Sequence, residues 1–147
     1  MRLILLAGLA MGLAACSNSG EGTAENAAST APAPAVIGDV DLNQPLRALG
    51  TEPFWGVDIT PETLTYSAVD HPGLTVRNPG PTVQGTTAVY ASSASDGSTM
   101  VVTLIATECS DGMSDRVYPL TARVEMGSQT LAGCAASVAF LESEPRP

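Results

Sequence analysis

Lysine is absent from this chain of 147 residues, and all six of its cationic side chains are arginines. Fifteen acidic residues outnumber them, so the formal net charge is −9. Such a chain repels phosphate backbones, which argues against a nucleic-acid partner. The sequence also has a single histidine and no Cys-x-x-Cys pair, so we expect no metal site and no cofactor.

Long apolar runs are missing as well. The longest stretch, Leu3 to Leu13, is far shorter than the roughly 20 residues that a transmembrane helix needs. Its length and the preceding Arg2 are typical of the hydrophobic region of a signal peptide. Residues 1–15 are therefore predicted to be a signal peptide.

The end of this stretch reads Leu13-Ala-Ala-Cys16. It resembles the lipobox of bacterial lipoproteins, in which an aliphatic residue and two small residues precede a cysteine. The resemblance implies a diacylglyceryl group on Cys16, cleavage after Ala15 and acylation of the new amino terminus. The alternative is an ordinary secretory signal that is cut near Ala15.

Lipidation would make the membrane a partner through the anchor alone. Ser17 stands where an aspartate commonly retains Gram-negative lipoproteins at the inner membrane. Its presence predicts an envelope protein of the outer membrane that faces the periplasm.

Residues 16–45 are rich in Ala, Ser, Gly, Pro and Glu and contain no aromatic residue. A segment of this composition cannot bury enough apolar surface to offset its chain entropy, which predicts a disordered linker. A short strand around Ala35 to Val40 is a weaker alternative within it. The folded domain is expected over residues 46–141, followed by a flexible tail at 142–147.

The domain has the two-residue period of β-strands. Apolar residues alternate with polar ones in Thr63–Ala68, in Arg116–Met126 and from Cys134 to Phe140. Ser98–Thr107 is almost continuously apolar, which suits a central strand covered on both sides. Pro119 interrupts one pattern and predicts an edge or a bulge. The expected fold is all-β, a small antiparallel barrel or sandwich with one disulfide.

Cys109 and Cys134 are the two cysteines left after lipidation of Cys16. In an exported chain two remaining cysteines usually pair. The competing interpretation, a reduced metal-binding pair, lacks further ligands. We therefore expect a disulfide.

The segment Thr107–Pro119 is the densest run of polar and turn-forming residues. It is interpreted first as a turn fixed by the disulfide. The alternative is a ligand-facing polar patch, and a calcium loop is disfavoured because the spacing does not fit an EF-hand. The candidate patch consists of Glu52, Trp55, Asp111, Ser114, Asp115 and Arg116.

Trp55 is the only tryptophan and follows Phe54. An exposed aromatic pair could grip a glycan or a peptide. The other interpretation, which we favour, is that the pair closes one end of a small barrel.

Three motifs recur together in a family of uncharacterised bacterial envelope lipoproteins, which this chain resembles. They are Gly50-Thr-Glu-Pro-Phe-Trp55, Cys109-Ser-Asp-Gly-Met-Ser-Asp-Arg-Val-Tyr-Pro119 and Leu131-Ala-Gly-Cys-Ala135. Members of that family can be joined to META-type or lysozyme-inhibitor-like domains. The resemblance implies a small β domain with Cys109 paired to Cys134, and it implies no catalytic residue.

Two classes of function follow. The first is a non-catalytic, lipid-anchored module, with a binding or stress-related role, whose partner is an envelope protein, a glycan or a small ligand. The alternative is a hydrolase of envelope polymers, which would use His71 with Ser110 or Ser114. Paired carboxylates among Asp58, Glu62, Asp111 and Asp115 are a second way to build that hydrolase.

Overall fold

The computed structural model of this protein describes residues 35–143. The predicted signal peptide, Cys16, most of the predicted linker and residues 144–147 lie outside the described residues. Within residues 35–143 the chain forms thirteen strands and one helix.

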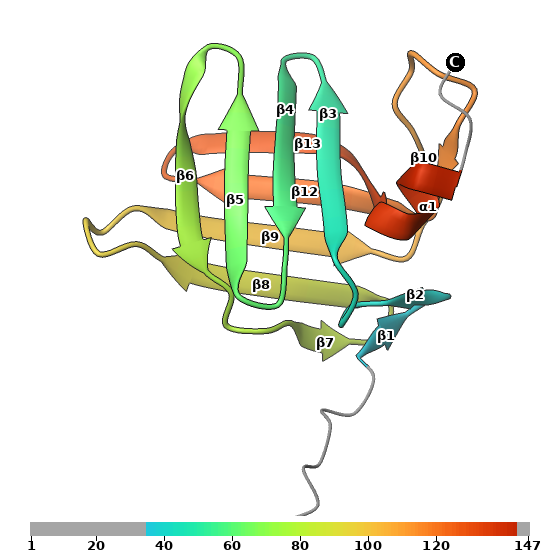
Figure 1. The fold of residues 1–147 in the computed structure, drawn as a ribbon, viewed down its shortest axis with the longest axis horizontal. Helices are drawn as coiled ribbons and strands as arrows, with labels where there is room; N and C mark the ends of the chain where they lie inside the picture. Colours follow the sequence, from blue (N-terminus) through green and yellow to red (C-terminus); the bar gives the residue numbers. More distant parts are fainter. Residues whose placement is uncertain (1–34, 144–147) are drawn as a thin grey trace, which may run out of the picture. The chain divides into compact units, whose positions relative to one another are not determined.

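Nine strands form one antiparallel sheet in the order β6-β5-β4-β3-β13-β12-β9-β8-β7. Its strands are β3 (Leu46–Thr51), β4 (Phe54–Ile59), β5 (Thr63–Ala68), β6 (His71–Arg77), β7 (Thr82–Gln84), β8 (Thr87–Ser93), β9 (Thr99–Ile105), β12 (Leu120–Met126) and β13 (Gln129–Ser137). In Figure 1 strands β3 to β6 cross β8, β9, β12 and β13 at a steep angle, so the sheet curls into a half-barrel. This confirms the predicted all-β, antiparallel class.

The inner face of the curl holds the core. On β9, Met100, Val102 and Leu104 are fully buried, whereas Val101 and Ile105 on the other face are only half-buried. The apolar run over Ser98–Thr107 predicted a strand covered on both sides. In the structure only one side is covered completely. The strand is central, because it pairs with both β12 and β8.

A hairpin precedes the sheet, made of β1 (Val36–Ile37) and β2 (Val40–Asp41). Ile37, Val40 and Leu42 are buried in the same core as the sheet residues. Residues 35–45 therefore belong to the folded domain, which corrects the boundary predicted at residue 46. Three apolar side chains in an Ala- and Pro-rich stretch are enough to dock the segment, as the weaker strand interpretation allowed.

Pro119 divides the strand that was expected over Arg116–Met126. Val117–Tyr118 forms β11, which pairs with β10 (Cys109–Ser110) in a separate small hairpin, and β12 begins at Leu120. Proline has no N–H to donate to a ladder, so the chain leaves one sheet and enters the other at this residue.

The last strand ends at Ser137, whereas alternation predicted that it would continue to Phe140. Helix α1 (Val138–Ser143) follows. The Ser137 hydroxyl accepts a hydrogen bond from the Phe140 N–H at 3.1 Å, which caps the helix start. The cap turns the chain before the apolar alternation ends, and Glu142 and Ser143 become helical instead of part of a tail. Among the described residues, no helix has both the length and the apolar character that a membrane span requires.

Candidate functional site

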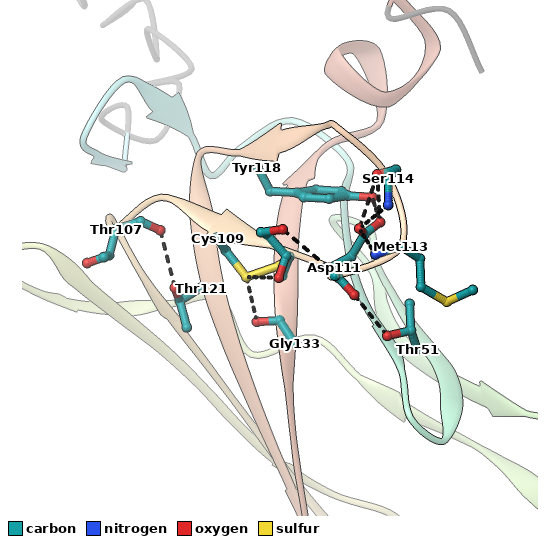
Figure 2. Close-up of a disulfide and its surroundings, with 12 residues drawn as sticks. Thr51, Thr107, Cys109, Asp111, Met113, Ser114, Tyr118, Thr121 and Gly133 are labelled. Atoms are coloured by element: carbon teal, nitrogen blue, oxygen red, sulfur yellow. Dashed lines mark hydrogen bonds between the residues drawn. A yellow bond between two sulfur atoms is a disulfide. The ribbon is translucent and has the colours of Figure 1, made fainter. Parts of the chain in front are cut away.

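The β10–β11 hairpin is organised by one carboxylate, that of Asp111. It accepts hydrogen bonds from the N–H groups of Met113 at 3.0 Å and Ser114 at 2.8 Å. The hydroxyl groups of Ser114 and Tyr118 donate to it as well, each at 2.9 Å. Figure 2 shows these donors gathered around Asp111, so the carboxylate is occupied by its own loop.

These bonds change the acidity of Asp111. Burial raises the pKa of the carboxyl. The hydrogen bonds from Ser114, Met113 and Tyr118 lower it by more than burial raises it, so the pKa falls to about 2. The carboxylate therefore stays charged and bound to its loop at neutral pH, which is typical of a structural group and not of a general acid.

Three further contacts connect the hairpin to the outer face of the half-barrel. The predicted disulfide joins Cys109 to Cys134 of β13, with 5.5 Å between the Cα atoms. Thr51 at the end of β3 donates from its hydroxyl to the Asp111 carbonyl at 3.0 Å (Figure 2). The disulfide sulfur of Cys109 also lies 3.4 Å from the Gly133 carbonyl oxygen. The first interpretation of this segment, a turn fixed by the disulfide, describes it correctly.

Trp55 lies inside the half-barrel and not on a ligand-facing surface. It is 5 % exposed and packs in the main core. Added Cβ atoms at Gly50 or Gly133 would collide with the indole ring, so these glycines leave the space that it fills. Phe54, its neighbour, points outward and is 58 % exposed. The two aromatic residues therefore separate, and Trp55 is removed from the candidate patch.

The remaining members of the patch occupy different places. Glu52 and Asp111 line one cavity of about 330 Å³ beside the hairpin. Arg116 lies 5.9 Å from the centre of the Tyr118 ring and lines a separate groove of about 440 Å³ next to α1. Asp115 is exposed and lines none of the cavities described here. The patch is therefore not a single site.

The groups suggested for hydrolysis have other partners. The Nδ1 atom of His71 lies 3.1 Å from the Pro72 carbonyl oxygen, and its ring stands edge-on to Tyr66 with 6.1 Å between centroids. Ser114 donates to Asp111, and Ser110 accepts from Gly112. No hydrogen bond joins His71 to either serine within residues 35–143.

The acidic residues are also separated. Asp58 pairs with Arg47 at 3.0 Å on β3, and Asp111 is held in the hairpin. Glu62 lies in the β4–β5 turn, at the opposite end of these strands from the β10–β11 hairpin (Figure 1). Over the same described range, no group of three metal-ligating side chains occurs.

A hollow that we call the mouth crevice lies at the open end of the half-barrel. It consists of two adjoining cavities of about 420 and 480 Å³, which share Tyr66 and His71. The first cavity is bounded by the tips of the β3–β4 and β5–β6 hairpins. The second lies between β6 and the β8–β9 and β12–β13 turns, which extend past β6 in Figure 1.

The crevice combines an apolar lining with an acidic rim. Leu74 and Met126 line it and pack against the core, and Val69 at the β5–β6 tip is 82 % exposed. Asp70 and Asp96 lie at its rim, and no arginine is among the residues that line either cavity. A concave apolar surface with a few charges is the usual form of a binding site in the mouth of a barrel.

Sequence reasoning missed this site because its walls come from four segments that are distant in the sequence. Two signals were present in the sequence. Val69 is a large apolar residue beside a turn, where a polar residue is usual, and Phe54 adjoins a tryptophan that the fold buries.

Comparison of the chain with models of protein families, with curated proteins and with solved structures finds no significant match.

Proposed function

We propose that this chain is a lipid-anchored envelope lipoprotein whose half-barrel is a non-catalytic binding module, with the mouth crevice as its binding site. The observation that carries the proposal is the crevice itself: Leu74 and Met126 give it an apolar lining, and Asp70 and Asp96 give it an acidic rim. Its partner would be an envelope protein, a glycan or a small ligand.

The position of the β1–β2 hairpin supports this arrangement. In Figure 1 the β1–β2 hairpin, where the described chain begins, lies at the opposite end from the tips of the β3–β4 and β5–β6 hairpins. A lipid on Cys16, joined through a linker to Ala35, would leave the mouth crevice free of the attachment point. The lipobox-like Leu13-Ala-Ala-Cys16 sequence supports the anchor, and Ser17 supports an outer-membrane location facing the periplasm.

A hydrolase is the less supported alternative. His71 contacts Pro72 and Tyr66, whereas Ser110 and Ser114 bond within their own hairpin. Among the candidate carboxylates, Asp58 pairs with Arg47 and Asp111 is bonded within its own loop. Asp115 is exposed in that loop, and Glu62 lies at the opposite end of the strands. A nucleophile requires a base within hydrogen-bonding reach, and these contacts give no support to such a pair.

Site-specific photocrosslinking in cells that express the full chain tests the proposal. A benzophenone amino acid at Val69, in the crevice, should give a reproducible adduct on irradiation. The same group at Val36, which is 44 % exposed on β1, is the control and should give little or none. Mass spectrometry of the adduct distinguishes a protein, a glycan and a small molecule.

The variant His71→Ala separates the two function classes. It should cause no envelope polymer to accumulate uncleaved, because a binding module needs no general base. Equal crosslinking from Val69 and Val36 would contradict the crevice as the site. Accumulation of an uncleaved envelope polymer in the His71→Ala strain would favour the hydrolase.

A further inference from the structure

We propose that the edge strand β6 accepts an added β-strand, supplied by an extended polypeptide segment in which apolar and basic residues alternate. The inference rests on the proposed function, because it names the partner class for the mouth crevice. Its basis is the juxtaposition of a free strand edge, an apolar groove beside that edge and a rim of carboxylates.

Strand β6 ends the nine-stranded sheet and has a ladder partner only on the β5 side. The Ser92 hydroxyl of β8 donates to the Arg77 carbonyl at 2.6 Å, so that carbonyl points away from β5. Thr63, the register partner of Arg77, bonds through its own N–H and C=O to Thr60. The Thr63–Arg77 pair is therefore one of the non-bonded pairs of the ladder.

From Arg77, whose carbonyl is already bonded to Ser92 of β8, the edge that β5 does not use continues along β6 to Thr75. Backbone groups alternate between the two sides of an antiparallel strand, so the N–H and C=O of Thr75 point to the same side as the Arg77 carbonyl. Beyond the bulge opposite Ser67, the exposed start of β6 contains Pro72 and Gly73. No ladder partner meets Thr75 on this side among residues 35–143. An extended peptide recognises such an edge through main-chain hydrogen bonds.

The second cavity of the crevice runs beside this edge. Its volume is about 480 Å³, and its opposite wall is formed by the β8–β9 and β12–β13 turns. Leu74 of β6 and Met126 of β12 both line it and pack against the core. Successive side chains of an added strand point to opposite faces, so every second one would enter this apolar groove.

The charges of the rim favour a basic segment. Asp96, at the β8–β9 turn, lines this groove, and Asp70, at the β5–β6 turn, lines the adjoining first cavity of the crevice. The Asp96 carboxylate accepts the Ser98 N–H at 2.8 Å, and this bond lowers its pKa, so the group is ionised at neutral pH. A second copy of this chain would bring the same acids and a net charge of −9, so repulsion opposes self-pairing through β6.

A defined peptide tests the inference with the purified full chain. The probe is a seven-residue, end-capped and fluorescently labelled peptide of alternating valine and lysine, and its binding is followed by anisotropy. Two N-methylated forms, one at every valine and one at every lysine, block opposite edges of the peptide. We expect one of them to lose binding and the other to retain it, because only one edge pairs with β6. A peptide of alternating valine and glutamate should bind at least about tenfold more weakly.

Variants of β6 give the matched control. Thr75→Pro removes an outward N–H that the β5 ladder does not use, so the fold should be preserved. Thr75→Val removes the side-chain hydroxyl, as Thr75→Pro also does, but it keeps the N–H. Binding should fall about tenfold or more in Thr75→Pro and stay within about twofold in Thr75→Val. Asp70→Asn with Asp96→Asn should weaken binding of the lysine peptide and reduce its dependence on salt.

Several outcomes would overturn the inference. They are no binding of the valine–lysine peptide, equal binding of the glutamate peptide, and equal loss with both N-methylated forms. Full binding by a folded Thr75→Pro variant would do the same. If Thr75→Pro keeps the Val69 photoadduct in cells, the crevice still binds a partner and only strand addition fails. If the chain with Thr75 unchanged gives no adduct from Val69, the proposed function itself is contradicted.

Discussion

The Tyr118 hydroxyl donates a hydrogen bond to the Asp111 carboxylate at 2.9 Å, and this bond spans the β10–β11 hairpin. Tyr118 is 4 % exposed and belongs to a small outer cluster with Cys134 and Ala136. The loop carboxylate is thus connected to the outer face of the sheet through one buried ring. A loop held in this way resists opening, because its carboxylate is already occupied by donors of its own hairpin.

Asp111→Asn should therefore reduce stability in a pH-dependent manner. The pKa of Asp111 is lowered to about 2 in the folded chain, so its contribution is complete above its ordinary pKa near 3.8 and is lost as the pH falls through 2. At pH 7 we expect a loss of about 1–2 kcal/mol in unfolding free energy, reduced by the partial exposure of the loop.

Denaturant unfolding of the wild type and Asp111→Asn at pH 7 and pH 2.5 measures this effect. The difference between the two proteins should shrink to less than about half at the lower pH. Tyr118→Phe, which keeps the ring, should cost about 1 kcal/mol at pH 7. A difference between wild type and Asp111→Asn that does not change with pH would contradict the role given to the carboxylate.

Removal of the disulfide should destabilise the domain more strongly. The Cys109–Cys134 bridge spans a sequence separation of 25 residues, and closing a loop of this length contributes about 3.5 kcal/mol in the chain-entropy model. The double variant Cys109→Ala, Cys134→Ala avoids leaving a single thiol. Its melting temperature should fall by more than about 10 °C, measured by circular dichroism. The wild type with reductant is the parallel sample, and a transition that reductant does not move would refute the stabilising role of the bridge.

Gly133 should be one of the least replaceable residues of the sheet. A Cβ there would collide with the Leu49 carbonyl and lie 2.9 Å from the Trp55 ring. Gly133→Ala should cost about 3 kcal/mol and shift the fluorescence of the only tryptophan to the red, because the indole must move. Gly56→Ala is the matched control, since its Cβ would be crowded only by the flexible end of Arg47 at 3.2 Å and would lie at an ordinary 3.7 Å from the Ala48 carbonyl oxygen. Equal stability of the two variants would show that Gly133 does not shape the Trp55 site.

Much of this fold follows from local patterns in the sequence. Alternation located β5 and β12, because one buried face imposes a two-residue period. The disulfide was predicted from the two cysteines that remain if Cys16 is lipidated and the chain is exported, because such cysteines usually pair. Alternation alone did not locate the end of β13, since the Ser137 cap depends on how the backbone turns there.

The candidate site was harder to predict than the fold. Polar residues in Thr107–Pro119 suggested a ligand patch, but Asp111 uses them to close its own loop. The mouth crevice consists instead of ordinary residues such as Leu74 and Met126, which only the curl of the sheet brings together. Such a site carries no local signal, because it depends on how strands distant in the sequence pack.

Membrane attachment is predicted to depend on one atom, the sulfur of Cys16. Cys16→Ser should move the protein from the membrane to the soluble fraction, since two or more acyl chains hold a protein on a bilayer and a signal-cut chain has none. Fractionation of the host cells measures where the protein lies. Mass spectrometry of the mature amino terminus measures whether it carries acyl chains. The control is Ser17→Asp, which should keep the lipid but shift a Gram-negative protein toward the inner membrane. Retention of Cys16→Ser on membranes after a salt wash would contradict lipidation at this residue.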